Sequence, residues 1–181
     1  MDLSKVTKEI LITEELLIQR VKELGDEITK DYEGKDVLLV CVLNGAIMFM
    51  SDIMKTIKLP VEIDFMAVSS YGVSTKSSGV VKIIKDLDKT VEGKSIIIIE
   101  DIIDSGLTLA YLLENLKSRG PESIEVCTLL DKPTGRKAHV PTKYVGFSIK
   151  DEFVVGYGLD YAEKYRNIPY IFVLKEEVYA N

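Results

Sequence analysis

Residues 95–109, SIIIIEDIIDSGLTL, place carboxylates, hydroxyls and a glycine directly after a run of four isoleucines. The isoleucines predict a strand that is buried on both faces, and Glu100 and Asp101 stand at its end. Two neighbouring carboxylates in such a place destabilise a fold unless a cation or a hydroxyl-bearing ligand meets them. The acid pair therefore indicates a ligand site.

The residues after the acid pair predict an anion cradle. Asp104, Ser105, Gly106, Leu107 and Thr108 open a helix, and the first N–H groups of a helix have no partner within it. These N–H groups, the helix dipole and two hydroxyls favour a bound phosphate, and a glycine lets the backbone approach it closely. The alternative is an acidic surface loop in which Asp104 or Ser105 is an ordinary helix cap.

A second loop connects the apolar run Val37–Leu43 to the helical pattern of residues 46–57. It contains Leu43, Asn44 and Gly45. In parallel sheets that are covered by helices, ligands bind outside the carboxyl ends of the strands, at loops that lead into helices. This loop is therefore a second candidate, although Asn-Gly is equally typical of a plain strand-to-helix turn.

The elements that must position these loops follow from the spacing of apolar residues. Thr13 is expected to cap an amphipathic helix, and a second apolar helix face is expected from Leu109 to Leu116. Strands are expected at residues 37–43, 61–67, 80–84, 95–99 and 123–130, and near 144–149, 153–157 and 170–174. This alternation predicts an α/β fold, with a mostly parallel central sheet flanked by helices.

The composition limits the remaining choices. The 181 residues are expected to form one domain, 1–181, and 23 Lys and Arg against 29 Asp and Glu, without a basic block, argue against nucleic acid as a partner. The longest nearly apolar run, 37–50, is shorter than the roughly 20 residues of a membrane-spanning helix. With no secretion signal visible, we expect no membrane partner, a cytoplasmic location, and buried free thiols at Cys41 and Cys127.

Residues 95–109 resemble the phosphoribosyl pyrophosphate signature of type I phosphoribosyltransferases, and residues 10–174 resemble the hypoxanthine-guanine branch of that family. The resemblance implies the type I fold, in which a small hood subdomain comes from the C-terminal segment with help from the N-terminal one. It implies transfer of 5-phosphoribose from phosphoribosyl pyrophosphate to hypoxanthine or guanine, forming IMP or GMP and pyrophosphate in purine salvage. It also implies Mg²⁺ as the cofactor, a 6-oxopurine base as the acceptor, and a homodimer or homotetramer.

The resemblance also assigns the two loops. It implies that Glu100 and Asp101 hold the ribose hydroxyls and the Mg²⁺ shell, that residues 104–108 wrap the 5-phosphate, and that Asp104 is the general base at the purine N7. For Leu43, Asn44 and Gly45 it implies a pyrophosphate loop with backbone amides and a non-proline cis peptide. Many relatives carry Lys or Arg where this chain has Asn44, so a charged contact to pyrophosphate is left open.

The remaining assignments come from the resemblance alone. It implies that Ser70 and Tyr71 belong to a lid and that Lys132 donates a hydrogen bond to the purine 6-oxo group. It implies that the Phe153 ring stacks on the base and that the Val154 backbone meets the edge of the base. It also implies a combined purine and second Mg²⁺ site at Asp160 and a pyrophosphate contact at Arg166. Without it, the residues would be read as a disordered loop, core side chains and solvated charges.

Three other functions can be weighed against this one. A P-loop at Gly93-Lys94-Ser95 would need a glycine at position 88, which is Asp. A P-loop also follows a strand, whereas this motif precedes one. Residues 86–90 resemble the nucleophile motif of haloacid dehalogenase-type phosphohydrolases, but too few residues separate them from Glu100 for the rest of that fold. A phosphoribosyltransferase-fold regulator that binds RNA or DNA is a further alternative, disfavoured by the acidic chain.

Overall fold

The two candidate loops lie on one central sheet. The computed structural model describes residues 3–70 and 81–180, and within them a six-stranded sheet has the order β4-β3-β2-β5-β6-β7. Its strands are β2 (Val37–Leu43), β3 (Val61–Ser70), β4 (Val81–Lys85), β5 (Ser95–Ile103), β6 (Ser123–Asp131) and β7 (Tyr144–Ser148). Every pairing in it is parallel except that of β3 with β4. The predicted mostly parallel α/β architecture is confirmed.

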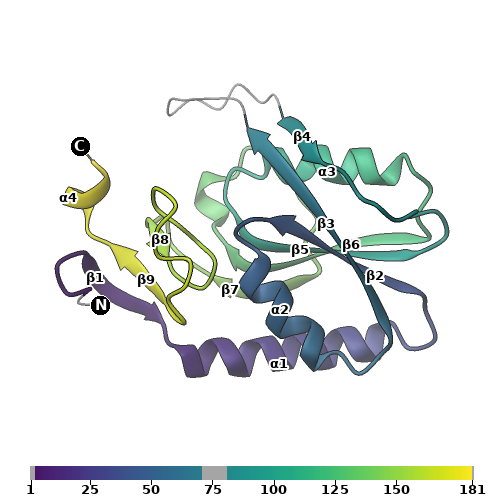
Figure 1. Cartoon of the computed structure of the whole chain (residues 1–181), viewed down its shortest axis with the longest axis horizontal. Coiled ribbons are helices and arrows are strands. Elements are labelled where there is room, and N and C mark those ends of the chain that lie inside the picture. Colours follow the sequence, from purple (N-terminus) through teal and green to yellow (C-terminus); the bar gives the residue numbers. More distant parts are fainter. Residues whose placement is uncertain (1–2, 71–80, 181) are drawn as a thin grey trace.

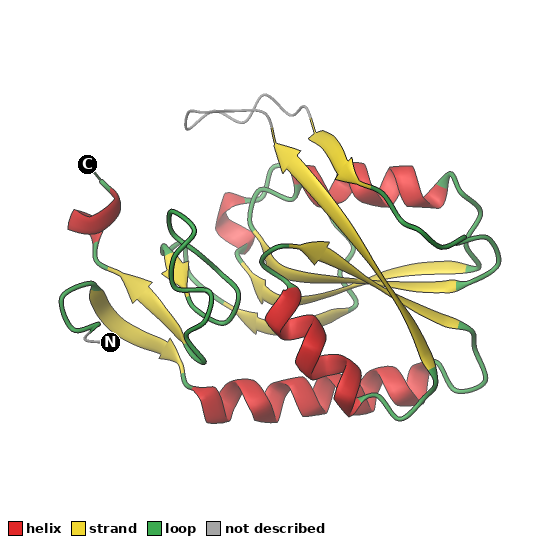
Figure 2. Cartoon of the chain, in the orientation of Figure 1, coloured by secondary structure: helices red, strands yellow, loops and turns green. Residues whose placement is uncertain are grey.

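Helices cover both faces of this sheet (Figures 1 and 2). Helices α1 (Glu14–Asp31) and α2 (Ile47–Thr56) lie on one face, and α3 (Leu107–Lys117) lies on the other. Along β2, Leu39 and Cys41 pack into the core beneath α1 and α2, whereas Leu38 and Val40 pack beneath α3. Successive side chains of a strand point to opposite faces, so a strand buried on both faces needs an unbroken apolar run.

Helix α1 begins and packs as its sequence predicts. Thr13 Oγ1 accepts a hydrogen bond from Leu16 N at 3.4 Å. Leu17, Leu24 and Ile28 are fully buried against the sheet. Burial of each such side chain stabilises a fold by roughly 1.5–3 kcal/mol, so packing of this face contributes more than the helix's own propensity.

A smaller sheet stands beside the central one (Figure 1). It joins β1 (Thr7–Ile12), β9 (Ile171–Leu174) and β8 (Val154–Val155) in the order β1-β9-β8, and helix α4 (Glu176–Tyr179) follows it. Strand β1 has no counterpart among the strands expected from the sequence. The strand expected over 153–157 was too long, because Gly156 and Tyr157 have φ of 100° and 50° and cannot continue a strand.

The chain reverses its direction of winding between β2 and β5. From β2 it passes to β3 on one side and later to β5 on the other, so the carboxyl ends of β2 and β5 are neighbours. Such a switch point leaves a crevice in which ligands bind. Strand β5 is longer than expected: Glu100 pairs with Thr128 and Ile103 with Asp131, so the acid pair lies within the strand instead of after it.

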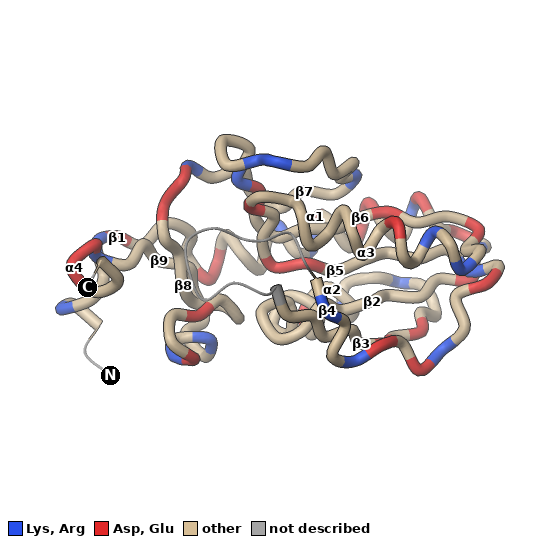
Figure 3. Tube along the Cα trace, turned by 90° about the horizontal axis from the view of Figure 1, so that it is seen from above, with Lys and Arg blue, Asp and Glu red and all other residues tan. Residues whose placement is uncertain are grey.

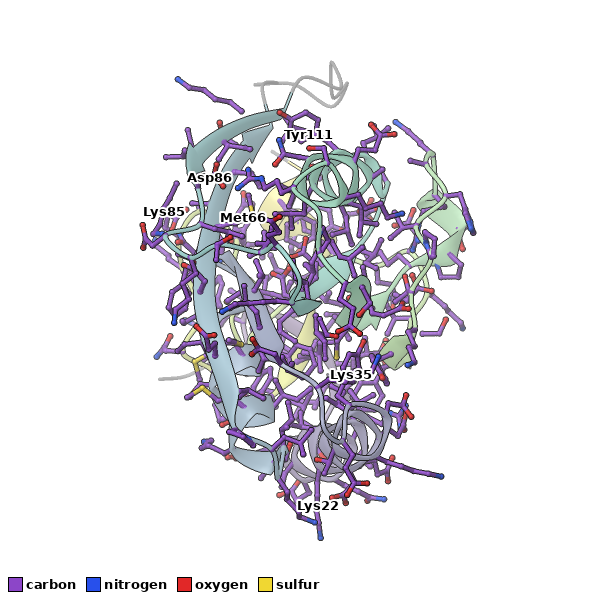
Figure 4. The ribbon with its side chains drawn as sticks, turned by 90° about the vertical axis from the view of Figure 1, so that its right-hand side faces the viewer. Lys22, Lys35, Met66, Lys85, Asp86 and Tyr111 are labelled. Carbon is purple, nitrogen blue, oxygen red and sulfur yellow. The ribbon has the colours of Figure 1, made fainter. Side chains whose placement is uncertain are left out.

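Charged residues of both signs are spread along the described chain, and apolar side chains fill the space between the sheet and its helices. Figure 3 shows Lys and Arg interspersed with Asp and Glu along the trace. In Figure 4, Met66 lies among the side chains between the sheet and α3, whereas Lys22 extends outward from α1. Cys41 and Cys127 are buried free thiols, as predicted. Within the described residues, no helix is both long and apolar enough to cross a membrane.

Candidate active site

The acid pair lies near the carboxyl end of β5, with Glu100 buried and Asp101 partly buried. Glu100 is 8% exposed, and within the described part of the chain its buried Oε2 atom has no hydrogen-bond partner. Burial, followed by the charge of Asp101, raises the pKa of Glu100 well above 4.5. Burial also raises the pKa of Asp101 to about 6, although its Oδ1 accepts a hydrogen bond from Ile102 N at 2.8 Å. A buried, unpaired carboxylate has no structural benefit, so a ligand is the better explanation.

This burial predicts that the acid pair destabilises the ligand-free protein above pH 6. Asp101 binds its proton more tightly in the folded chain than in the unfolded one, so folding stability falls as pH rises from about 4 to about 6 and stays lower above it. The rise of its pKa from 3.8 to about 6 corresponds to roughly 3 kcal/mol at most. We therefore expect Asp101→Asn, and more so Glu100→Gln with Asp101→Asn, to raise the Tm at pH 7.5 and to change it much less at pH 4.

Thermal unfolding of the ligand-free protein at the two pH values tests this expectation. Glu33→Gln is the matched control, because Glu33 is an exposed carboxylate in the turn after α1. A lower Tm for Asp101→Asn at pH 7.5 would assign the carboxylate a structural role and remove the argument for a ligand.

The predicted anion cradle lies beside the acid pair. Gly106, with φ of 77°, is the N-cap residue of α3, so Asp104 and Ser105 are not the helix cap. A cavity of about 170 Å³ opens here, lined by Glu100 and by residues of the 102–109 segment, including Ser105 and Thr108. The left-handed backbone and the close approach of Ala138 O, 2.8 Å from where a Cβ would lie, explain the glycine.

The second loop faces the acid pair across the switch point. The Leu43-Asn44 peptide bond is cis, as the resemblance implied. Gly45 is buried, and a Cβ on it would overlap the Asp101 carboxylate. Asn44 is exposed. The structure thus brings residues 43–45 into contact with Asp101, with glycine required by the close approach.

Arg166 approaches the same place from the segment between β8 and β9. Its Nη1 donates to Gly158 O at 2.9 Å and its Nη2 lies 2.8 Å from Asp160 Oδ1. A Cβ on Gly158 would overlap Gly45 O, so this segment packs directly on the second loop. The charges of Arg166 and Asp160 reach Asp101, the first lowering and the second raising its pKa. Arg166 and Asp160 are therefore part of the site's electrostatics.

Lys132 follows β6 and lies between two carboxylates. The residue is only 7% exposed. Its Nζ is 3.9 Å from Asp104 Oδ2 and 3.6 Å from Asp151 Oδ1. A solvated surface lysine would not be buried in this way, so the lysine has a fixed place beside the cradle.

Phe153 lies next to β8 and is 36% exposed, while Val154 is buried. The Phe153 ring stacks on Tyr179 with centroids 4.8 Å apart and meets Tyr161 edge-on. The ring is thus held by aromatic neighbours while part of its surface stays open. Of the two lid residues, Tyr71 lies outside the described residues, and Ser70 is described only as the last residue of β3.

A larger cavity, of about 400 Å³, lies elsewhere, between α1 and α2. Its walls include Ile18, Met48 and Tyr157, and neither the acid pair nor the cradle reaches it. Its polar groups already pair with one another, because Asp52 accepts a hydrogen bond from Tyr157 Oη at 2.6 Å and forms an ion pair with Lys55. The smaller cavity beside β5 is therefore the candidate active site.

Comparison with known proteins identifies the family of this chain. The model of the phosphoribosyl transferase domain matches residues 7–162. The hypoxanthine-guanine phosphoribosyltransferase of Bacillus subtilis (strain 168) is 59% identical to this chain, over 96% of this chain and 97% of that protein. The chain belongs to the phosphoribosyltransferase family. The family predicted from residues 95–109 is thereby confirmed.

Two solved phosphoribosyltransferases have the same fold. A crystal structure of a hypoxanthine phosphoribosyltransferase from Staphylococcus aureus is 55% identical, covers 97% of this chain and 95% of that one, and has a TM-score of 0.94. A mutant hypoxanthine phosphoribosyltransferase from Trypanosoma cruzi, in a ternary substrates complex, is 39% identical with a TM-score of 0.91 and covers 97% and 99% of the two chains.

The residues present fit a magnesium ion that is shared with a ligand. Among the described residues, no group of three or more His, Cys, Asp or Glu could hold a metal by itself. Mg²⁺ usually keeps few protein ligands and takes oxygens from a bound phosphate. The unpartnered Glu100 Oε2 and the Asp101 carboxylate supply such oxygens. Asp160 is already engaged, because its Oδ1 pairs with Arg166 and its Oδ2 accepts from Glu163 N at 2.9 Å.

Several residues of the site were not found from the sequence. Gly135, Arg136, Asp151 and Tyr179 all contact residues that the sequence did single out. The segment DKPTGR carried one signal, a proline and a glycine that predict a turn after the lysine. The contacts themselves cross between elements, so spacing along the chain gives no sign of them.

Proposed function

We propose that this protein is a hypoxanthine-guanine phosphoribosyltransferase, which transfers 5-phosphoribose from phosphoribosyl pyrophosphate to hypoxanthine or guanine. One observation carries the proposal: a buried lysine and an open carboxylate, Lys132 and Asp104, stand 3.9 Å apart at the edge of the phosphate cradle. A donor for a 6-oxo group and an acceptor for the N7 proton are then both beside the sugar phosphate. The relatives carry the same name.

The residues divide the work of the reaction. Residues 104–108 hold the 5-phosphate through N–H groups and hydroxyls at the start of α3, and the acid pair orients the ribose hydroxyls. Residues 43–45 and Arg166 hold the pyrophosphate oxygens as the bond to the ribose anomeric carbon breaks. Glu100 and Asp101 would hold Mg²⁺, and Asp160 would hold a second ion once its contacts with Arg166 and Glu163 N are released; the metal would neutralise charge on the leaving oxygens. Asp104 accepts the N7 proton as the new C–N bond forms.

The base is held from the other side of the site. We assign the 6-oxo group to Lys132, stacking to Phe153, and the base edge to the backbone of Val154 and to Asp160. The sheet β1-β9-β8 then acts as the hood of a single domain, with Ser70 and Tyr71 as the lid. The segment between β8 and β9 packs on residues 43–45 at Gly158, which supports this assignment. A homodimer or homotetramer and a cytoplasmic location stay predictions.

The phosphohydrolase alternative finds no support at residues 86–90. Asp86 pairs with Arg119, with Nη1 2.9 Å from Oδ1, near the C-terminal end of α3. Asp64 Oδ2 accepts hydrogen bonds from the N–H groups of Asp88 and Lys89 at 2.9 and 2.8 Å. These acids therefore fold a loop that leads into β5, at the end opposite the cradle (Figure 4 labels Asp86). Along the described residues, Lys and Arg alternate with Asp and Glu (Figure 3), and the regulator that binds RNA or DNA stays an untested alternative.

A panel of bases tests the proposed function. The protein is incubated with phosphoribosyl pyrophosphate, Mg²⁺ and hypoxanthine, guanine, xanthine or adenine, and nucleotide and pyrophosphate are measured. IMP or GMP formation, abolished in Glu100→Gln with Asp101→Asn, supports the proposal. Release of inorganic phosphate without any base acceptor would contradict it.

Gly135 provides a prediction about the general base. A Cβ at this position would lie 2.7 Å from Asp104 Oδ1, which is the far end of a flexible side chain. Gly135→Ala should therefore displace the carboxylate with little change in Tm, and a misplacement of about 1 Å can cost up to ~10²-fold in rate. We expect kcat to fall ~10-fold or more. Thr134→Ala, in the same exposed turn, is the control, and an unchanged kcat in Gly135→Ala would show that the Asp104 position is not critical.

A further inference from the structure

Arg136 contacts the back of the phosphate cradle. Its Nε donates to Asp104 O at 3.0 Å and its Nη2 to Ile103 O at 3.2 Å. The same guanidinium pairs with Asp131, the last residue of β6. The side chain is mostly buried, with 21% of its surface exposed. A single planar group thus joins the end of β6 to two successive carbonyls of the segment that leads into the cradle.

The neighbouring backbone completes this contact. Lys137 N and Ala138 N both donate to Ser105 O, at 2.9 and 3.1 Å. Three successive carbonyls, those of residues 103, 104 and 105, therefore point toward the segment 132–138. In a trans peptide the N–H group points opposite to the carbonyl of the same peptide plane. The N–H groups of residues 104, 105 and 106 consequently point away from Arg136, on the side of the cavity that these residues line.

We propose that Arg136 is a positioning residue for the transfer reaction, which fixes the cradle's N–H groups and the Asp104 carboxylate by holding the carbonyls of Ile103 and Asp104. The inference rests on the proposed function. Arg136 is not placed against the phosphate, the pyrophosphate or the base. It acts through the peptide planes, and it ties them to the same segment that carries Lys132. The planar guanidinium of Arg136 donates to two carbonyl oxygens from two nitrogen atoms, whereas a lysine has a single ammonium nitrogen, which explains why this position takes arginine.

The test compares three substitutions by steady-state kinetics, with thermal unfolding measured for each. Arg136→Met removes both donors, Arg136→Lys retains the charge toward Asp131, and Arg119→Met is the matched control. Arg119 forms a similar ion pair, with Asp86, at the opposite end of α3. For Arg136→Met we expect the KM for phosphoribosyl pyrophosphate to rise ~10- to 100-fold and kcat to fall ~10-fold. The KM for hypoxanthine should change less than ~3-fold, and Arg136→Lys should be intermediate.

A merely structural role would give a different result. It would lower the Tm of Arg136→Met and reduce active enzyme without separating the two KM values, as in Arg119→Met, and this outcome would overturn the proposal. Calorimetric binding of phosphoribosyl pyrophosphate with Mg²⁺ distinguishes a failure of the Arg136 proposal from a failure of the proposed function. If the wild-type protein makes no nucleotide, the proposed function is wrong. If the wild type and Arg136→Met bind phosphoribosyl pyrophosphate equally, Arg136 does not position the cradle.

Discussion

Adenine should be used at least ~10³- to 10⁴-fold less efficiently than hypoxanthine, as measured by kcat/KM. Lys132 is buried, and an ammonium group donates hydrogen bonds but accepts none. It can meet the 6-oxo oxygen of hypoxanthine or guanine, whereas the 6-amino group of adenine would place a second donor against it. A buried mismatch of this kind can discriminate by roughly 10⁴-fold, because the polar groups are left unpaired.

Guanine is the control for this prediction, since it retains the 6-oxo group and should be used like hypoxanthine. The variant Lys132→Gln provides a second test of the same base discrimination. A glutamine amide can turn either its oxygen or its nitrogen toward the base, so the substitution should lower hypoxanthine use and reduce the discrimination against adenine. Comparable use of adenine and hypoxanthine by the wild-type protein would show that Lys132 does not face the 6-position.

The place of the candidate site in the fold could be predicted from the sequence because it depends on local patterns. An unbroken apolar run predicts a strand buried on both faces, and the four isoleucines of β5 are such a run. Polar residues directly after two such runs, at Asn44 and at Glu100, then indicate the edge where ligands bind. The ends of β2 and β5 are indeed neighbours in the folded chain.

The contacts that complete the site could not be predicted in the same way. Gly45 is required by the Asp101 carboxylate, which comes from another strand, and Arg136 matters through carbonyls about 32 residues earlier in the chain. Spacing along the chain reports which face of an element a residue occupies, but not what it meets across the fold. Strand β1 was not predicted for the same reason. Its sequence pattern is short, and it forms a strand by pairing with β9 at the other end of the chain.

Asp104→Asn should lower kcat by ~10² to 10⁴, or roughly 3 to 5 kcal/mol of barrier, while the KM for phosphoribosyl pyrophosphate changes much less. The Asp104 side chain is 59% exposed beside the cavity, with Oδ2 3.9 Å from Lys132 Nζ. Because Gly106 is the N-cap of α3, the substitution does not remove a helix cap. Asparagine keeps the size of the side chain, but its amide is a far weaker proton acceptor, so the change isolates basicity.

Asp151→Asn is the matched control for Asp104→Asn. Asp151 Oδ1 lies 3.6 Å from Lys132 Nζ, so its substitution removes a comparable charge beside the same lysine without touching the cradle. If the loss of charge near Lys132 were the cause, both variants would be slowed alike. If proton acceptance at N7 is the cause, only Asp104→Asn is slowed in a single turnover, where product release does not contribute. An unchanged single-turnover rate in Asp104→Asn would remove this carboxylate from the chemical step, and a water molecule would then carry the N7 proton.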